Sequence, residues 1–263
     1  MLAIKYILAA LAVLVLLVIG VWIIAIPEGT ILTLIGNSLS NSTIQIECDG
    51  FRKSLFFGFS AEKISVKKDE RLLIAINDFS GQIDPFSLIR LKLPCNFSGS
   101  AGGGRLQGSA ELLGKSHEVS VTVADADIAA IPFFELVGMK GSGRLSVKMI
   151  LKNNQGDIRF DLKEMQVSSG TFGSISVPLN FFQSAQGSLE ISGSRAKVNS
   201  FTMDGPGVYA RIRGDIADSR LALTLEIMPE KTFADKNPVF MLLEKYKVSP
   251  GRYSVPLTNR LSF

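Results

Sequence analysis

Two hydrophobic patterns divide the chain. The first is an unbroken apolar run, Ile7–Ile26, which contains no charged residue. Its length of about 20 residues is that of a helix crossing the ~30 Å hydrocarbon core of a bilayer. Lys5 precedes the run, which favours a cytoplasmic N-terminus under the positive-inside rule. Trp22 lies near the end of the run, where an indole suits the lipid–water boundary. We therefore expect residues 1–27 to form a cytoplasmic stub and a transmembrane anchor, with residues 28–263 across the membrane.

A cleaved signal peptide is the alternative interpretation of this run. The apolar core of a signal peptide is usually ~7–15 residues long and precedes small residues in an A-x-A pattern. The run here is longer, and the residues from Trp22 to Glu28 offer no such cleavage site. Both features favour an anchor that is not cleaved.

The second pattern begins near Thr43, where apolar and polar residues alternate with a period of two. One apolar face and one wet face on each strand is typical of antiparallel sheets, whereas parallel strands are usually buried on both sides. The sequence therefore predicts a mainly β fold with a largely antiparallel sheet. The alternating sets are Ile64/Val66, Leu72/Ile74/Ile76, Val119/Val121/Val123, Leu145/Val147/Met149/Leu151, Ile158/Phe160/Leu162 and Leu221/Leu223/Leu225/Ile227.

A glycine-rich motif recurs in front of two of these strands. Gly102–Leu106 (GGGRL) is repeated as Gly141–Leu145 (GSGRL), and Ala185–Ile191 is a weaker echo. Such glycines indicate a permissive backbone at strand entries or bulges. A phosphate-binding loop would instead need a strand before it and a helix after it. Asn153–Gly156 separates two alternating runs and predicts a hairpin connection.

A few short segments have helical rather than alternating patterns. Glu28–Ser42 places apolar residues on one helical face, and Asp125–Gly138 has an aspartate cap and a glycine stop. Asn237–Val248 begins with a proline and carries an apolar side, which predicts a further helix. Tyr253–Thr258 then predicts a last strand, in which Pro256 indicates a sheet edge or a bulge.

Composition and charge narrow the possible partners. The chain contains 24 glycines and has a net charge of +4 with a pI near 9.0. Its basic residues are dispersed among acidic ones, so no basic stripe indicates nucleic acid. A solvated basic surface close to anionic headgroups is the simpler interpretation.

The chain has two cysteines, Cys48 and Cys95, each on the apolar phase of a strand-like segment. Both side chains are therefore expected to point inward. A disulfide between neighbouring strands and two buried free thiols are both open alternatives in an oxidising compartment. Two cysteines this far apart do not suit a metal site.

Residues typical of catalysis are sparse. His117 is the single histidine, and we expect it at the surface. Asp125 and Asp127 stand at an expected helix start, where capping accounts for them. The sequence contains no G-x-S-x-G, H-E-x-x-H or Walker motif. We therefore expect a protein that is not an enzyme and needs no cofactor or metal.

The anchor, the following short helix, the one-sided strands and the recurring glycine motif together resemble the AsmA-like superfamily of Gram-negative envelope proteins. Within it, the chain is most similar to the type II secretion system protein N (GspN) family. The residues that carry the resemblance are Asp127–Pro132, Gly141–Leu145 and Pro250–Thr258.

The resemblance implies an inner-membrane anchor and a periplasmic body built as a curved, open half-barrel of antiparallel strands. It also implies association with type II secretion or other envelope proteins, and membrane phospholipid as a ligand of the apolar inner face. A scaffold whose apolar residues form a closed core is the alternative, and alternation alone does not separate the two. The residues expected to line a lipid groove are Leu145, Val147, Met149, Phe160, Leu162, Leu221, Leu223 and Leu225.

Overall fold

The computed structural model describes residues 44–90, 92–111, 118–153, 155–168, 170–172, 175–177, 179–193, 195–217 and 220–260. The apolar run Ile7–Ile26, the segment Glu28–Ser42 and His117 lie outside these residues. Within the described part of the chain, no helix is both long enough and apolar enough to cross a membrane.

Most of the described chain is β-strand, and the helices are all short. The strands are β1 (Ile44–Asp49), β2 (Arg52–Lys53), β3 (Gly58–Lys68), β4 (Arg71–Ile83), β5 (Pro94–Ala101), β6 (Gly104–Glu111), β7 (Glu118–Asp127), β8 (Gly141–Lys152), β9 (Gln155–Val167), β10 (Gly170–Phe172), β11 (Ile175–Val177), β12 (Ser184–Ser192), β13 (Arg195–Gly205), β14 (Val208–Ala217), β15 (Arg220–Pro229), β16 (Lys247–Ser249) and β17 (Arg252–Arg260). The α-helices are α3 (Pro132–Leu136), α4 (Lys231–Lys236) and α5 (Val239–Leu242), and the 3-10 helices are η2 (Leu55–Phe57), η3 (Pro85–Arg90), η4 (Ile128–Ala130), η5 (Leu179–Phe181) and η6 (Glu244–Tyr246).

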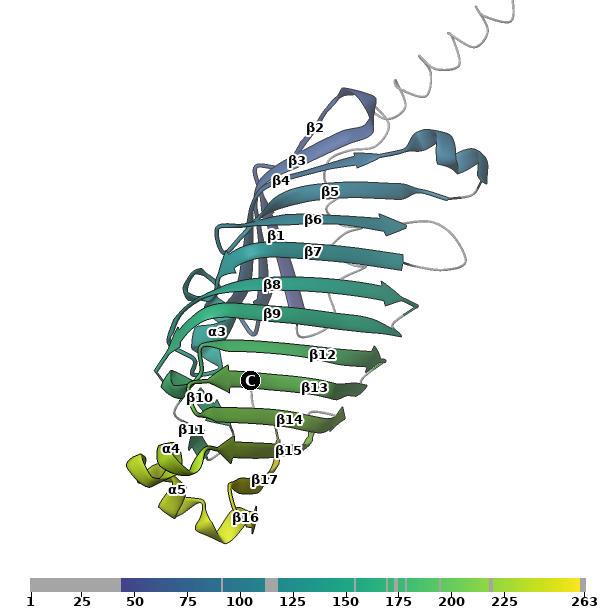
Figure 1. Ribbon diagram of the computed structural model, residues 1–263. Helices are drawn as coiled ribbons and strands as arrows, with labels where there is room; N and C mark the ends of the chain where they lie inside the picture. Colours follow the sequence, from purple (N-terminus) through teal and green to yellow (C-terminus); the bar gives the residue numbers. More distant parts are fainter. Residues whose placement is uncertain are drawn as a thin grey trace, which may run out of the picture.

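The strands form one large antiparallel sheet of 15 strands, in the order β1-β3-β4-β5-β6-β7-β8-β9-β12-β13-β14-β15-β17-β16, with β2 paired to β3. Strands β10 and β11 make a separate hairpin. The sheet twists and curves along its length and does not close on itself (Figure 1). The expectation of a mainly β, antiparallel fold with a few short helices is confirmed.

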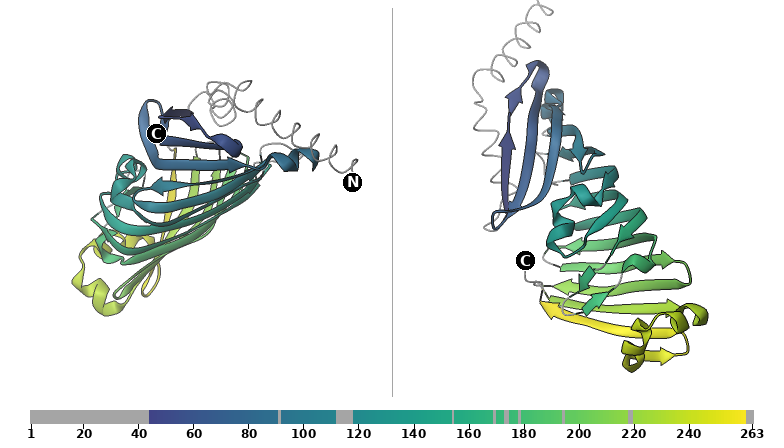
Figure 2. Two further views of the ribbon diagram at one scale, coloured as in Figure 1. Left: turned by 90° about the horizontal axis from the view of Figure 1, so that it is seen from above. Right: turned by 90° about the vertical axis from the view of Figure 1, so that its left-hand side faces the viewer.

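Near its first edge the sheet bends sharply. Asp78 has a positive φ of 51°, and the register of β4 against β5 shifts between Asn77 and Ser80. Such a bulge bends a strand and increases its twist. β4 pairs with β5 only from Ile76 onward, so β1 and the adjoining halves of β3 and β4 leave the main sheet as a three-stranded flap. Figure 1 shows β1 of this flap behind the main sheet, and the right-hand view of Figure 2 shows the flap turned away from the strands that follow it.

The glycine motif enters strands as expected, and its third glycine has a distinct reason to be there. Gly102 and Gly103 form the turn before β6, with φ values of 57° and 75°. Gly104 needs no unusual φ, but a Cβ there would lie 2.4 Å from the backbone oxygen of Ala124. The motif therefore combines a turn with a close backbone approach between β6 and β7.

The segment Asp125–Gly138 is not one helix, contrary to the prediction. β7 continues through Asp127, whose carboxylate accepts a hydrogen bond from the backbone of Ala129 at 3.0 Å and caps η4. Pro132 interrupts the helix because it has no N–H and disfavours helical torsions at the preceding residue. α3 then begins at Pro132, and Gly138 follows it with a φ of 77°, as the glycine stop predicted.

The predicted helix over Asn237–Val248 is also broken. Only Val239–Leu242 is α-helical; η6 follows, and the chain then enters β16, which pairs with β17. α4 lies before this segment and was not predicted. The hairpin at Asn153 joins β8 to β9 as expected, and Pro256 lies in the last long strand, beyond the part that β16 covers.

The main core lies along one end of the strands. Buried side chains of β8 to β17 pack there against η4, η5 and α5, through residues such as Ile128, Leu179 and Phe240. The connections at this end include α3, α4 and α5, whereas at the opposite end short turns join β8 to β9, β12 to β13 and β14 to β15, and η3 lies between β4 and β5 (Figure 1). One end of the apolar face is therefore covered, and the rest of the sheet is a single layer.

Candidate functional site

The apolar face of the sheet is organised in cross-strand rows, because directly paired residues of neighbouring strands point to the same face. The first row is Leu145, Leu162, Ala185, Met203, Ala210, Ile227 and Tyr253. The second row is Val147, Phe160, Gly187, Phe201, Ile212, Leu225 and Val255. The third row is Met149, Ile158, Leu189, Val198, Gly214, Leu223 and Leu257, and the fourth is Leu151, Gly156, Ile191, Ala196, Ile216 and Leu221.

Burial decreases steadily from the first row to the fourth. Every residue of the first row is buried, from Ala210 at 1% exposed to Leu145 at 9%. In the second row, β14, β15 and β17 contribute buried residues, whereas Val147, Phe160 and Phe201 are part exposed. In the fourth row all six residues are part exposed. The apolar face is thus a closed core at its covered end and an open apolar trough, made of the part-exposed residues of rows two to four, elsewhere.

The opposite face of the same strands is polar. Between the first and second rows, the residues that point the other way form the row Ser146, Asp161, Gln186, Thr202, Arg211, Glu226 and Ser254. This row contains no apolar residue. A one-residue shift in register would exchange the two faces on any of these strands, so the pattern fixes which face is apolar.

On the apolar face, aromatic rings of one strand lie over glycines of the neighbouring strand. The third row continues from Met149 through Val121 into the strands near the flap. There Phe59 pairs with Gly81, and Phe97 pairs with both Gly81 and Gly108. A Cβ on Gly108 would lie 2.4 Å from Phe97 Cζ, and one on Gly81 would lie 2.2 Å from Phe59 Cζ. Each ring therefore lies flat over the glycine of its neighbour. Phe79 joins these rings, with its centroid 6.0 Å from that of Phe59 and 5.7 Å from that of Phe97.

The same arrangement recurs in the middle of the sheet, at Gly187. Its position for a Cβ lies 2.5 Å from Phe160 Cζ, and the ring centroids of Phe160 and Phe201 are 5.4 Å apart. Gly187 has no side chain between Phe160 and Phe201, so both rings have room on the sheet surface. The result is an apolar floor with few projecting side chains.

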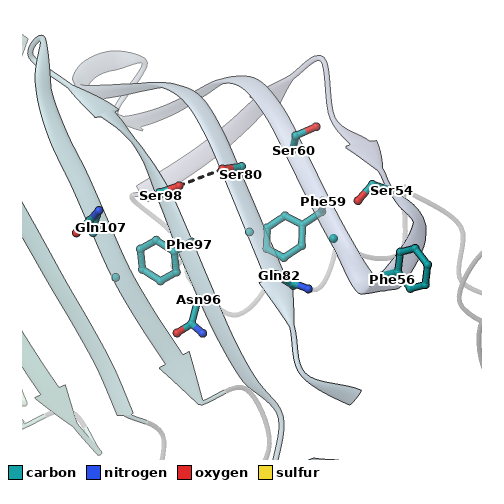
Figure 3. Close-up of a pocket in the computed structure, with 13 residues that line it drawn as sticks. Ser54, Phe56, Phe59, Ser60, Ser80, Gln82, Asn96, Phe97, Ser98 and Gln107 are labelled. Atoms are coloured by element: carbon teal, nitrogen blue, oxygen red, sulfur yellow. Dashed lines mark hydrogen bonds between the residues drawn. The ribbon is translucent and has the colours of Figure 1, made fainter. Parts of the chain in front are cut away.

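An open cavity of about 770 Å³ lies over β3 to β6 (Figure 3). Its lining includes Phe59 and Phe97 together with Ser80 and Ser98, which alternate with them along the strands and whose hydroxyls are joined by a hydrogen bond of 3.1 Å. No charged side chain lines it. Its chemistry suits a neutral or apolar group rather than an ion.

The eight residues expected to line a lipid groove all lie on the apolar face, in two groups separated by β12, β13 and β14. Five of them are part exposed and belong to the trough: Val147, Met149, Phe160, Leu221 and Leu223. The other three, Leu145, Leu162 and Leu225, are at most 9% exposed and belong to the closed core.

The prediction missed the strands between these two groups. β14 has a regular alternation from Val208 to Ile216 that could have been recognised. The alternation of β13 is interrupted in the sequence, because its register against β14 shifts between Val198 and Phe201. The aromatic floor of β3 to β5 was also missed, and its cross-strand Phe–Gly pairs become visible only once the register is known.

The disulfide alternative does not occur in the structure. Cys48 lies on β1 and Cys95 on β5, with β3 and β4 between them, and both are free thiols. Cys95 is buried, as expected, and Cys48 is part exposed. Burial raises the pKa of the Cys95 thiol to about 11, and burial followed by the charge of Asp49 raises the pKa of Cys48.

On the polar face, the buried charged residue among those that the structure describes is Glu226, whose side chain is 7% exposed. Its Oε1 accepts hydrogen bonds from Arg252 at 2.7 Å and from Arg213 at 3.0 Å. The hydrogen bond from Arg252 is the main cause that lowers the pKa of the carboxyl; the charge of Arg213 adds to it, against the opposing effect of burial. These contacts tie β14, β15 and β17 together on the side away from the trough.

Fold and face together define a class of protein: a single open antiparallel sheet with one polar face and one apolar trough. No three His, Cys, Asp or Glu side chains of the described residues are grouped as metal ligands would be. Comparisons with protein-family models, with curated proteins and with solved structures each found no match.

Proposed function

We propose that this chain is an envelope protein of the GspN type, related to the AsmA-like superfamily, that binds or transfers phospholipid. In this proposal, residues 7–26 anchor it in the inner membrane and the sheet lies in the periplasm, in association with type II secretion or envelope biogenesis. The observation that carries the proposal is the graded exposure of the apolar face, which changes from a closed core to an open trough along the same strands.

The dimensions of the trough suit acyl chains. From β3 to β17 the sheet has twelve strands in succession, which at ~4.8 Å per strand gives a surface about 50 Å long. An acyl chain that fills one leaflet of a bilayer spans about 15 Å, half of the hydrocarbon core. Several chains could therefore lie side by side or in sequence on this surface.

The energetics suit exchange rather than permanent storage. An apolar face gains about 0.8 kcal/mol for each methylene that it removes from water. An acyl chain in a bilayer is already out of water, so its transfer to a trough of Leu, Ile, Val and Phe side chains is nearly neutral. A surface of this chemistry releases a lipid about as readily as it accepts one.

Native mass spectrometry of the detergent-extracted full chain tests the proposal. The wild type is expected to retain phospholipid. Phe160→Asp and Leu223→Asp, which change part-exposed residues of the trough, should keep a cooperative thermal transition but retain less lipid. Thr224→Asp is the matched control, because Thr224 is the neighbour of Leu223 and faces the polar side, opposite Arg213.

Two outcomes contradict the lipid proposal. One is a wild-type chain that retains no phospholipid, and the other is a pair of folded trough variants with the wild-type lipid load. Either outcome favours a scaffold for secretion machinery without a lipid ligand.

The location has its own test. A reporter fused after Phe263 should be active only when it reports the periplasm, because one membrane span with Lys5 inside leaves the C-terminus outside. Activity of a cytoplasmic reporter at this position would contradict the proposed topology.

A further inference from the structure

The end of the sheet farthest from the flap carries an unusual group of exposed apolar side chains. Met241 is 77% exposed, Leu242 76% and Val248 65%. All three belong to the segment 230–252, which includes α4, α5, η6 and β16 and forms the lower end of the molecule in Figure 1. We call this segment the tip. Single exposed apolar residues are common, but a group of them marks an interaction surface.

The tip packs against the sheet through Phe240, and this packing leaves the neighbouring apolar side chains exposed to solvent. Phe240, only 5% exposed, anchors α5. Its ring centroid lies 5.6 Å from that of Tyr253 in the first row and 6.0 Å from that of Phe233 in α4. With Phe240 directed into the core, the next two residues of this short helix, Met241 and Leu242, point out to solvent.

Basic residues share the tip with the apolar group. The tip has five exposed cationic side chains and three exposed acidic ones. Lys247 pairs with Glu244, and Arg252 pairs with Glu226 outside the tip, so the excess is one positive charge when Glu226 is counted. Lys245 also stands over the ring of Tyr246, 4.9 Å from its centroid. Long basic side chains place their stems along apolar surface and their charge in the headgroup layer. The cationic residues are Lys231, Lys236, Lys245, Lys247 and Arg252, and the acidic ones are Glu230, Asp235 and Glu244.

We propose that the tip docks on the surface of an anionic phospholipid bilayer. Met241, Leu242 and Val248 enter the boundary between headgroups and acyl chains, and the lysines contact the phosphates. Three aliphatic side chains expose too little area for a stable protein interface, which takes about 800 Å² from each partner. Shallow insertion of a few apolar residues among basic ones is instead typical of proteins that bind membrane surfaces.

This inference deepens the proposed function and rests on it for its purpose, because the tip joins the covered end of the apolar face. The first row ends at Tyr253, which contacts Phe240 of the tip. A docked tip would therefore bring the covered end of the apolar face next to the bilayer, with the open trough farther along the same strands.

Flotation tests the docking. The purified full chain is held in nanodiscs and mixed with vesicles of phosphatidylglycerol and phosphatidylcholine, with empty nanodiscs as the background. Met241→Asp combined with Leu242→Asp should lower the vesicle partition constant by roughly a hundred-fold, since each of the two lost apolar insertions corresponds to about ten-fold. Ile150→Asp combined with Leu136→Asp is the matched control, because both residues are 40% exposed and lie outside the tip.

A charge variant gives a second, independent measurement. Lys231→Glu combined with Lys245→Glu should weaken binding to the anionic vesicles and leave binding to pure phosphatidylcholine vesicles unchanged. Wild-type binding should also fall as salt is raised, because exposed charges are screened. Unchanged flotation of both tip variants, or an equal loss in the matched control, would overturn the proposal.

The detergent-extracted protein from which each nanodisc sample is made is analysed for retained phospholipid, which separates the two proposals. Lost docking with a normal lipid load supports the tip as a docking surface alone. Normal docking of a wild-type chain that carries no lipid contradicts the lipid trough and leaves the tip proposal standing. Normal docking of the tip variants with a normal lipid load contradicts only the tip.

Discussion

Leu223 and Leu225 lie on the same strand and the same face, two residues apart, yet they belong to different environments. Leu225 is 2% exposed and pairs with Ile212, 3% exposed, and Val255, 1% exposed. Leu223 is part exposed and pairs with Gly214 and Leu257. Replacing each by aspartate therefore measures where the closed core ends and the open trough begins.

The expected cost at Leu225 follows from two contributions. Loss of the buried leucine costs about 2–3 kcal/mol. An aspartate with no partner there must be protonated, and at pH 7 this costs about 4 kcal/mol, given its usual pKa of about 3.9. The sum, about 6–7 kcal/mol, is comparable with the whole stability of a typical domain. At Leu223 the carboxylate can reach water, so only part of the first contribution applies, about 1–2 kcal/mol.

Urea denaturation of the full chain, followed by circular dichroism, measures both variants at pH 7 and pH 4. Leu225→Asp should be largely unfolded at pH 7 and regain stability at pH 4, because a buried aspartate has a raised pKa and its neutral form is favoured as the pH falls. Leu223→Asp should remain folded at both values. Equal destabilisation at the two positions would refute the division of this face into core and trough.

Three further predictions concern other parts of the sheet. Gly104→Ala should destabilise the protein by several kcal/mol in thermal unfolding, because its Cβ would meet backbone atoms at 2.4 Å. A Cβ at Gly103 would have no atom within 4 Å, so Gly103→Ala should cost only about 1 kcal/mol, which comes from its φ of 75°. Equal costs of the two substitutions would contradict the close approach of β6 and β7. Glu226→Gln should lower stability by about 1–2 kcal/mol at pH 7, because it weakens two charge-assisted hydrogen bonds. Since the pKa of Glu226 is lowered, the wild type should lose this contribution as the pH falls through the folded-state pKa, and a difference that does not shrink in acid would argue against it. Native protein should contain both cysteines as free thiols. An alkylating reagent should modify Cys48 faster than Cys95, because Cys95 is buried and its thiol has a pKa of about 11. Recovery of a disulfide-linked peptide pair would contradict the strand order.

The regular strands were predictable because their alternation is a local property of the sequence. β8, β9 and β15 alternate without a break over the predicted residues, and the structure places these residues on one face. The hairpin between β8 and β9 was predictable for the same reason, since its turn residues are adjacent in the chain.

What could not be predicted depends on contacts between distant residues. The bend at Asp78, which separates the flap from the main sheet, leaves no clear mark in the alternation of β4. Likewise, nothing local distinguishes Leu223 from Leu225, because their burial depends on whether covering helices lie above them. The eight predicted groove residues therefore divide between the open trough and the closed core, a division that alternation does not reveal.

The central claim is that the open part of the apolar face holds lipid, and photo-crosslinking tests it most directly. A photoreactive phenylalanine analogue is placed at position 223 in one full-length chain and at position 224 in another, and both are irradiated in membranes. Adjacent residues of a strand point to opposite faces, so the two probes differ only in the face that they report. Our account predicts phospholipid adducts from position 223 and none from position 224. Equal adducts from the two positions, or none from position 223, would contradict it.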